Sequence, residues 1–472
     1  MANTLNCEVL VVGSGPSGAV TAAMLAEAGR DVLLVEEGPN LTPDSAANFS
    51  YAEMDQKYRN GGLTTTFGKT NITYIEGRCV GGASEINAAL YHRPIDEVVD
   101  GWARDFSISD FSADSLGEHF QVIEDEVRCS GRPYGFSPAS MRLKQGADAL
   151  GWKEGEIERF WRFDEEDGRW GRRQSMSRTC VPRAVAAGCR LEADLRVRKL
   201  IFKGNRAVAA CARRRARDVK LTFDTVVLCC GAVQTPTMLR RSGVTKGIGD
   251  SLQLHPMVRI AARFDDVVND PAWGVPVRQV SEFKPELTLG CSHSSLPHIA
   301  LWLGQEVEDR RAILANWDHV AVFYAAVCGK GTGTVRALPL LDEPLIRYEF
   351  APSDMGLLGE GLVRLGELVL AAGAKEIFSP FEGQPGLSTR RQVEKLRRLP
   401  SGTAINVTTI HLFSSCPMGE DERCPVDSHG RVKGLDNVRI HDSSLLPTSP
   451  GVNPQGTIMA IARRNTAHLL GG

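Results

Sequence analysis

The residues with the clearest chemical meaning lie near the start of the chain, in the glycine-rich run Gly13-Ser14-Gly15-Pro16-Ser17-Gly18. An apolar run, Val9 to Val12, precedes it, an alanine-rich stretch follows it, and a second apolar run, Val32 to Val35, ends at Glu36. Strand, glycine turn, helix, strand and acid form the pattern of a dinucleotide-binding βαβ unit. The glycines permit a tight turn, close approach to a pyrophosphate and close helix packing. We expect Glu36 to bind the adenosine ribose hydroxyls, although this unit alone does not distinguish NAD from FAD.

A second group of chemically useful residues lies in the tail, residues 406–470. His411 precedes a Ser-Ser-Cys-Pro turn, Asp442 follows a short apolar run, and Asn453-Pro454 precedes a helix predicted from about Gly456. An unperturbed imidazole has a pKa of about 6.5 and can accept a proton near neutral pH. A helix N-terminus directs N–H groups toward an electron-rich ligand.

Other histidines have structural explanations. His255 precedes Pro256 at a strand boundary, His429 lies in a polar turn, and His468 is on the terminal helix. His441 adjoins Asp442, but on a strand the two side chains should point to opposite faces. From the residues alone, His411 is therefore one candidate base among several structural histidines.

Length and composition limit the alternatives. A chain of 472 residues is too long for one simple core, so two domains are expected. The net charge of −2 gives no electrostatic case for nucleic-acid binding, and no stretch reaches the roughly 20 apolar residues of a membrane span. The 12 cysteines include neither a CxxC motif nor a Cys/His ligand spacing, and the N-terminus has no signal-peptide core. We expect a cytoplasmic protein with reduced cysteines and no metal site.

The pattern along the chain predicts an α/β fold with two kinds of sheet. Short strands with a hairpin turn at Gly204-Asn205 precede a run that ends at Gly231, whose position suits the ligand crevice of a parallel sheet. Residues 355–373 follow the helical period. A second domain with an antiparallel sheet is predicted from the runs Val258–Phe264, His298–Leu303, His319–Val327 and Leu345–Phe350. The Arg- and Trp-rich stretch 154–178 is a solvated loop or a lid over a polar substrate.

Four blocks in order resemble the glucose–methanol–choline (GMC) oxidoreductases, a family of FAD-dependent alcohol oxidases and dehydrogenases. They are GSGPSG with its later acid, GRCVGGASEINAALYHRP, CCGAVQTPTMLRRSGV with GIGDSLQLHP, and VDSHGRVKGLDNVRIHDSSLLP with GVNPQGTIMAIARRN. The last block looks most like the sterol-oxidase and long-chain-alcohol-oxidase branches. The resemblance implies a Rossmann-like FAD domain and an architecture similar to p-hydroxybenzoate hydroxylase. We assign residues 1–110, 185–256 and 402–472 to the FAD domain, and 111–184 and 257–401 to the substrate domain.

The resemblance also implies roles for individual residues. His411 and Asn453 match the catalytic histidine and its partner. The chain is shorter than most members in its substrate domain, so no substrate-binding residue is carried over. Glu85 stands where some members attach FAD through a histidine, which implies non-covalent FAD. The residues that would hold FAD are Gly13, Ser14, Gly15, Pro16, Ser17, Gly18, Glu36, Gly81, Gly82, Ser84, Asn87, Ala88, Val197, Gly231, Asp442, Asn453, Pro454 and Thr457.

Three functions remain open at this stage. The first is oxidation of an alcohol to an aldehyde or ketone, with hydride transfer to flavin N5 and a histidine base. The second is a cyanohydrin-type lyase on the same flavin scaffold, and the third is a non-catalytic flavin-binding subunit. The tail favours a lipophilic or sterol-like alcohol, whereas the 154–178 stretch favours a sugar or an aminoglycoside. The sequence does not choose between O₂ and another electron acceptor.

Overall fold

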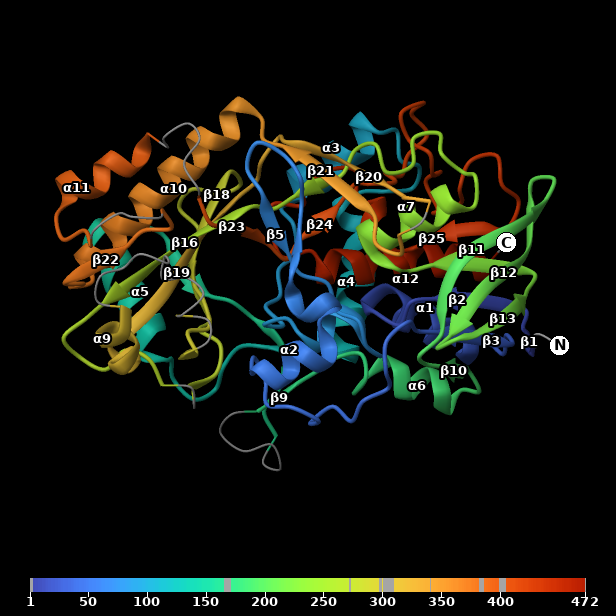
Figure 1. Ribbon diagram of the computed structural model, residues 1–472, viewed down its shortest axis with the longest axis horizontal. Coiled ribbons are helices and arrows are strands. Elements are labelled where there is room, and N and C mark those ends of the chain that lie inside the picture. Colours follow the sequence, from blue (N-terminus) through green and yellow to red (C-terminus); the bar gives the residue numbers. More distant parts are fainter. Residues whose placement is uncertain are drawn as a thin grey trace.

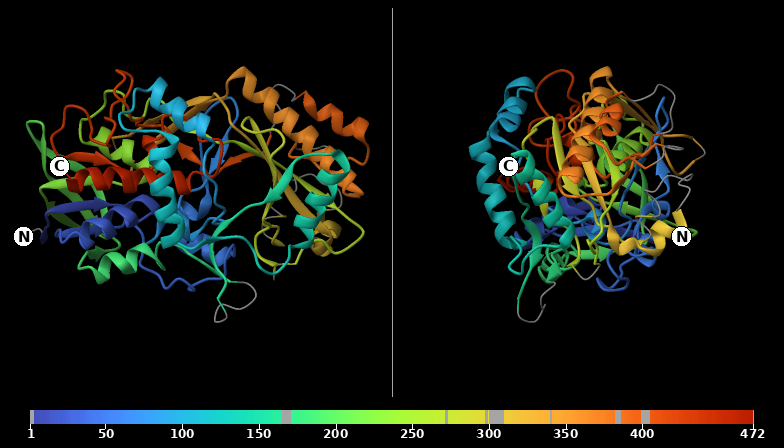
Figure 2. Two further views of the ribbon diagram at one scale, coloured as in Figure 1. Left: turned by 180° about the vertical axis from the view of Figure 1, so that it is seen from behind. Right: turned by 90° about the vertical axis from the view of Figure 1, so that its left-hand side faces the viewer.

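The protein is described here by a computed structural model in which two lobes lie side by side (Figure 1). One lobe holds both termini and a parallel sheet, and the other holds a large, mainly antiparallel sheet flanked by helices. The view from behind shows the same two lobes (Figure 2). The structure describes residues 3–164, 171–270, 273–296, 299, 310–339, 341–381, 386–398 and 405–471.

The first lobe is built on a five-stranded parallel sheet. Its strands, in spatial order, are β10 (Arg190–Glu192), β3 (Val32–Val35), β2 (Val9–Val12), β14 (Thr225–Leu228) and β25 (Val438–Ile440). β2 and β3 are buried along their whole length, as expected for apolar runs in a parallel sheet covered on both faces. Helix α1 (Pro16–Glu27) packs between α6 (Cys180–Ala186) and the C-terminal helix α12 (Gln455–Gly471).

The turn from β2 into α1 requires glycine because three backbone segments meet there. A Cβ on Gly13 would lie 2.4 Å from the carbonyl oxygen of Cys229, and Gly13 has a φ of +98°. A Cβ on Gly18 would lie 1.9 Å from the carbonyl oxygen of Gly13. These contacts bring the first turn of α1 against the ends of β2 and β14.

The second lobe is built on a nine-stranded sheet. The helices α10 (Pro352–Ala371) and α5 (Pro138–Leu150) pack together and cover one face, where Leu358, Leu362 and Leu365 are fully buried. The strand order is β4 (Thr64–Thr65), β5 (Ile72–Tyr74), β23 (Val407–Thr409), β16 (Met257–Arg263), β19 (Val320–Val327), β18 (Leu287–Cys291), β17 (Arg278–Val280) and β7 (Glu154–Glu156), with β22 (Glu376–Phe378) also paired to β16.

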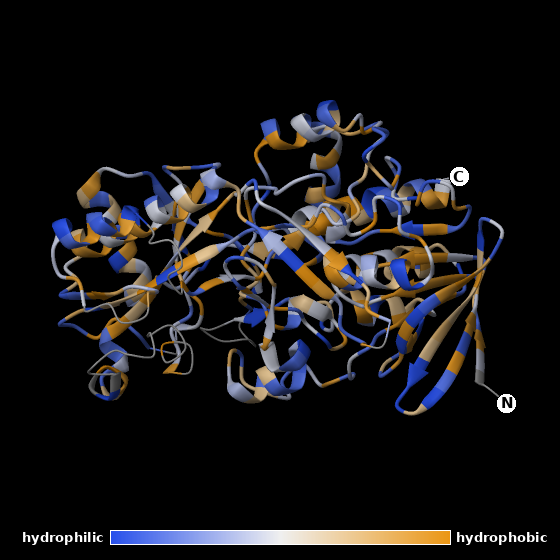
Figure 3. Cartoon of the chain, turned by 45° about the horizontal axis from the view of Figure 1, so that its top comes forward, coloured by the Kyte–Doolittle hydropathy of each residue, from blue (hydrophilic) through white to orange (hydrophobic). Residues whose placement is uncertain are grey.

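A smaller four-stranded sheet lies at the outer end of the first lobe. It contains β1 (Asn3–Asn6), β13 (Arg217–Thr222), β12 (Arg206–Arg214) and β11 (Arg196–Lys203). Hydrophilic and hydrophobic residues alternate along these strands, near the N-terminus in Figure 3, because one face is packed and the other meets water. The predicted hairpin turn at Gly204-Asn205 joins β11 to β12.

The remaining elements form the connections. Of these, α4 and α7 pack near the sheet of the first lobe, and the β20–β21 hairpin reaches from the second lobe toward α7. Their bounds are α2 (Tyr51–Lys57), α3 (Asp96–Asp105), α4 (Ala113–Glu126), β6 (Cys129–Ser130), β8 (Arg159–Arg162), β9 (Arg172–Arg173), α7 (Gly231–Arg241), β15 (Gln253–Leu254), α9 (Arg310–Ala315), β20 (Thr332–Arg336), β21 (Leu345–Glu349), α11 (Arg390–Glu394) and β24 (Leu412–Phe413).

The predicted fold class, Rossmann-like with a second, antiparallel domain, is confirmed, and the division into the residue ranges given above stays a prediction. Strand pairing and helix packing cross these ranges in two places. β5 and β23 fall in ranges assigned to the FAD domain, yet they pair within the nine-stranded sheet. α4 falls in a range assigned to the substrate domain, yet Leu116 and Phe120 are buried in the core of the first lobe, beside α12. The predicted strand at 298–303 lies, except for residue 299, outside the described residues.

No helix of the described residues combines enough length with enough apolar character to cross a bilayer.

The glycine contacts predict a matched pair of substitutions. Gly18→Ala should destabilise the protein by about 1–3 kcal/mol or more, because its methyl group would overlap the Gly13 carbonyl and the β2–α1 turn would have to open. Gly117→Ala, in α4 with no atom near the added Cβ, should be neutral or stabilising by about 1 kcal/mol. Thermal unfolding of both variants tests this, and equal stability of the two would contradict it.

Candidate functional site

A cavity of about 410 Å³ is lined by residues of both lobes. The carboxyl ends of β2, β3, β14 and β25 border it on one side, and β16, β17, β18 and β19 border it on the other. Ligands of parallel α/β sheets bind at this edge, outside the carboxyl ends of the strands. The cavity is therefore the candidate site.

Glu36 ends β3 at the cavity wall, and its carboxylate is held by the glycine turn. Its Oε2 accepts hydrogen bonds from the Ser14 amide at 3.1 Å and the Ser14 hydroxyl at 2.7 Å, and its Oε1 accepts one from the Gly38 amide at 2.9 Å. Burial raises the pKa of Glu36, while these hydrogen bonds oppose the rise. A carboxylate has about four acceptor sites, so Glu36 keeps capacity for ribose hydroxyls.

A second glycine loop approaches the first one closely. A Cβ on Gly82 would lie 2.8 Å from the Cα of Gly15, so the two backbones meet without side chains between them. The Gly81 amide donates to the Ser14 hydroxyl at 3.1 Å, and Ser84 closes its own turn by donating to the Gly81 carbonyl at 2.7 Å. Two such loops expose backbone N–H groups toward one space, which suits a pyrophosphate.

Asp442 follows the end of β25 and lines the cavity. One carboxylate oxygen accepts from the Gly231 amide at 2.9 Å, at the start of α7, and the other accepts from the Ser444 amide at 2.9 Å. Asp442 is buried, which raises its pKa, while these hydrogen bonds oppose the rise. His441 points away from the cavity, as predicted, with Nδ1 3.0 Å from the Thr21 hydroxyl oxygen.

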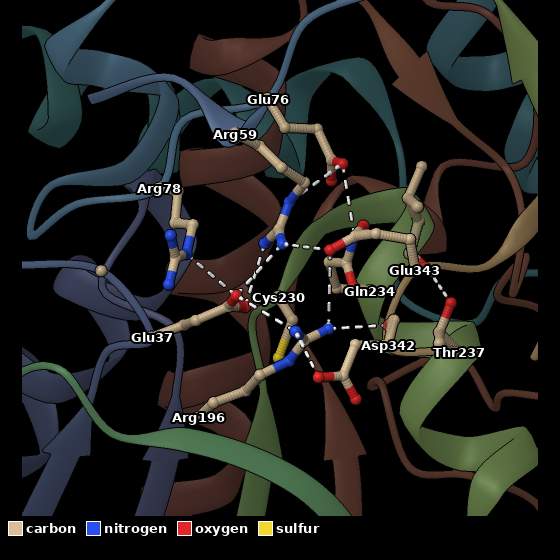
Figure 4. Close-up of polar contacts among 12 residues, drawn as sticks. Glu37, Arg59, Glu76, Arg78, Arg196, Cys230, Gln234, Thr237, Asp342 and Glu343 are labelled. Carbon is tan, nitrogen blue, oxygen red and sulfur yellow. Dashed lines mark hydrogen bonds and ion pairs between the residues drawn. The ribbon is translucent and has the colours of Figure 1, made fainter. Parts of the chain in front are cut away.

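A network of charged residues surrounds Arg59 at the wall of the cavity (Figure 4). Arg59 contacts Glu37 at 3.0 Å, Glu76 at 3.3 Å and Glu343 at 3.3 Å, and Arg196 reaches Glu37 at 3.7 Å. Burial alone would raise the pKa of Glu37, but the neighbouring arginines outweigh it and lower the pKa to about 2. This network was not predicted from the sequence, because its members have no shared motif and contacting pairs such as Arg59 and Glu343 are 284 residues apart.

His411 lies beside a second histidine on the opposite side of the cavity. β15 pairs with β24 so that Leu254 faces Leu412, which places His255 across from His411. Their Nδ1 atoms are 3.0 Å apart, and the Thr409 hydroxyl donates to the backbone carbonyl of His255 at 3.1 Å. Burial, reinforced by His255 and His92, moves the pKa of His411 well below 6.5, and burial lowers that of His255 to about 4.

Asn453 lies just before the N-terminus of α12 and also lines the cavity. Its side-chain amide donates to the Leu90 carbonyl at 3.4 Å, and Asn87 donates to the Gln455 side chain at 2.5 Å. The second glycine loop is thereby tied to the start of the C-terminal helix. Three segments far apart in sequence, near residues 90, 411 and 453, meet around one space.

Most of the predicted site residues line this cavity. Five do not: Ser14, Gly18, Gly81, Ser84 and Thr457. Those that do are Gly13, Gly15, Pro16, Ser17, Glu36, Gly82, Asn87, Ala88, Val197, Gly231, His411, Asp442, Asn453 and Pro454. His255 was given a structural explanation from the sequence, and His92, Arg259 and Lys284 were not singled out. The available signals were the position of His255 in the GIGDSLQLHP block and that of His92 in the GRCVGGASEINAALYHRP block.

The donor set fits a flavin dinucleotide. Two bare backbone loops face each other, with the backbone of Gly82 against that of Gly15, and an acid ends the second strand. The fold and cavity together define a dinucleotide-binding α/β protein with a second, substrate-side sheet.

Comparison with known proteins identifies the family. Family models described as GMC oxidoreductase match residues 54–257 and 332–462, and one described as FAD binding domain matches residues 6–93. An uncharacterized GMC-type oxidoreductase of Sinorhizobium fredii is 37% identical over 98% of this chain and 94% of its own length. A long-chain-alcohol oxidase of Arabidopsis thaliana is 26% identical over 97% of this chain and 68% of its own length.

Solved structures agree on the fold. The crystal structure of pyridoxine 4-oxidase from Mesorbium loti superposes with a TM-score of 0.76 at 20% identity, over 99% of this chain and 100% of the other. The chain belongs to the GMC oxidoreductases, as its motifs indicate, and FAD is its cofactor.

Proposed function

We propose that the protein oxidises an alcohol to an aldehyde or ketone, with His411 as the base and Asn453 as its partner. The observation that carries this proposal is the convergence of both side chains on the cavity that also holds the dinucleotide loops. Relatives named as long-chain-alcohol oxidases, and solved neighbours titled pyridoxine 4-oxidase and aryl-alcohol oxidase, support the reaction class. When bound, FAD supplies the acceptor for the hydride of the carbinol carbon.

His411 removes the hydroxyl proton. In a neutral histidine one ring nitrogen carries hydrogen and the other accepts. The Nδ1 atoms of His411 and His255 are within hydrogen-bond distance, and in the tautomer in which His411 donates its Nδ1–H to His255, its Nε2 is the proton acceptor. Asn453 donates a hydrogen bond that orients the substrate oxygen and stabilises the developing alkoxide.

FAD is held without a covalent bond in this proposal. Glu85 occupies the position at which some relatives attach the flavin, and its carboxylate accepts a hydrogen bond from the Ser177 amide at 3.2 Å rather than lining the cavity. The names of the relatives favour O₂ as the electron acceptor. The 12 cysteines are all free thiols, which supports a cytoplasmic location.

The alternatives use the same cavity. A lyase would need His411 as both base and acid and would leave the flavin oxidised. A non-catalytic flavin subunit would need no base at all. The paired histidines and the partner amide on one cavity count against a non-catalytic subunit. The relatives named as alcohol oxidases favour the oxidation over the lyase.

Replacing His411 tests its role. His411→Ala should slow anaerobic flavin reduction by roughly 10²–10⁴-fold, the usual contribution of a general base, while FAD stays bound through the distant glycine loops. His429→Ala is the matched control, since His429 stacks on His468 away from the cavity. Stopped-flow absorbance of the flavin measures both, and an unchanged rate in His411→Ala would exclude it as the base.

The lowered pKa of His411 predicts the pH profile. A histidine whose pKa lies well below 6.5 stays neutral as the pH falls from 8 to 6, so the proton acceptor is not lost. The limiting rate of flavin reduction at saturating alcohol should therefore be constant over this range. An inflection near pH 6.5 would show instead that the base has an ordinary imidazole pKa.

A further inference from the structure

One face of the nine-stranded sheet forms the wall of the cavity opposite the dinucleotide loops. The register places Gln279, Gly290, Tyr324 and Arg259 side by side on β17, β18, β19 and β16. The neighbouring row holds Thr288, Ala326 and Met257. Successive residues of a strand point to opposite faces, so Phe323 and Ala325 of β19 pack on the other face, in the core beneath α10.

The first row is a connected polar surface. A Cβ on Gly290 would lie 2.3 Å from the ring of Tyr324, so glycine leaves the space that the ring occupies. The Gln279 side chain donates to the Tyr324 hydroxyl at 3.4 Å, and its oxygen lies 3.1 Å from Nε2 of His92. These contacts connect Gln279, Tyr324 and His92 along the wall.

Two cationic side chains line the cavity on this side. Arg259 donates to the hydroxyl oxygens of Ser292, at 3.3 Å, and of Thr408, three residues before His411. Lys284 lies in the connection from β17 to β18. Burial lowers the pKa of Arg259 to about 10, and burial and Lys153 lower that of Lys284. An anion bound beside either group would favour its charged form.

The carboxylates of the cavity lie elsewhere. Among the described residues that line it, the acids are Glu36, Glu37, Glu76 and Asp442, and none of them is on β16, β17, β18 or β19. Each has partners of its own: backbone amides for Glu36 and Asp442, and Arg59 for Glu37 and Glu76. Among the described residues, the charge of the sheet wall is therefore positive.

We infer that the substrate is an alcohol whose other end carries an oxyanion, a carboxylate or a phosphate, bound on the sheet wall by Arg259 with Lys284. The inference rests on the proposed alcohol oxidation and adds its substrate class. The guanidinium fork suits either oxyanion, because its N–H donors can engage two oxygens at once. A cationic alcohol, in contrast, is repelled from this wall.

Binding to the wild-type holoenzyme is tested without turnover. Benzoate and phenyl phosphate lack a carbinol, and benzamide is the neutral isostere of benzoate. We expect one of the anions to perturb the flavin spectrum with a dissociation constant at least about tenfold below that of benzamide. The more effective anion identifies carboxylate or phosphate as the preferred group. Equal or tighter binding of benzamide would overturn the inference, whether or not any alcohol is oxidised.

Turnover then tests the substrate class. 4-(Hydroxymethyl)benzoate, 4-(hydroxymethyl)phenyl phosphate, 4-(hydroxymethyl)benzamide and choline are compared by anaerobic flavin reduction. An anionic alcohol should reduce the flavin with the highest kcat/KM. Faster reduction by the amide or by choline would refute the anion site while leaving the alcohol oxidation intact. No reduction by any alcohol would count against the proposed function, and the inhibitor titration would still decide the anion site.

Two variants locate the anion. Arg259→Gln and Lys284→Gln should each lower the preference for the anionic alcohol over its amide by about tenfold or more, mainly through KM. Arg263→Gln, on the same strand, is the matched control: Arg263 pairs with Glu376 outside the cavity, and its preference ratio should stay constant. An unchanged ratio in both cavity variants would exclude these residues as the anion site.

Discussion

Backbone atoms of three segments meet without intervening side chains at the carboxyl end of the parallel sheet, and the rest of the site depends on this contact. Gly18 touches the Gly13 carbonyl, Gly13 touches the Cys229 carbonyl, and Gly82 reaches Gly15 from a second loop. Any side chain here would separate α1 from its strand or the two loops from each other. Because the loops are this close, the ends of β2, β3 and β14 form one wall of a single cavity, and the substrate-side sheet supplies the opposite wall.

Much of the fold could be predicted from the sequence, because the signals were local. Apolar runs that end at a glycine or an acid predicted β2, β3 and β14, and leucines at helical spacing predicted α10. The domain boundaries were harder to predict, because strand pairing over long separations has no local signature. β5 and β23 are more than 300 residues apart, yet they are parallel neighbours in the large sheet.

The site was predictable where glycine or a family motif marked it, and less so where chemistry depends on three-dimensional surroundings. His255 looked like a structural residue before a proline, yet its register opposite His411 puts two ring nitrogens 3.0 Å apart. Burial lowers the pKa of His411 well below the ordinary imidazole value of about 6.5, and the sequence does not reveal burial. Arg259 lies in no recognisable motif. Its place at the cavity depends on the pairing of β16 and on the alternation of side chains between the two faces of the sheet.

The central claim is that an alcohol bound in this cavity is oxidised to an aldehyde or ketone while His411 takes the hydroxyl proton. The most direct measurement compares anaerobic flavin reduction by an alcohol of the panel with reduction by the same alcohol carrying deuterium on the carbinol carbon. Our account predicts that the alcohol bleaches the flavin and that deuterium slows the bleaching severalfold. Conversion of the alcohol with the flavin still oxidised would contradict it and indicate lyase chemistry instead.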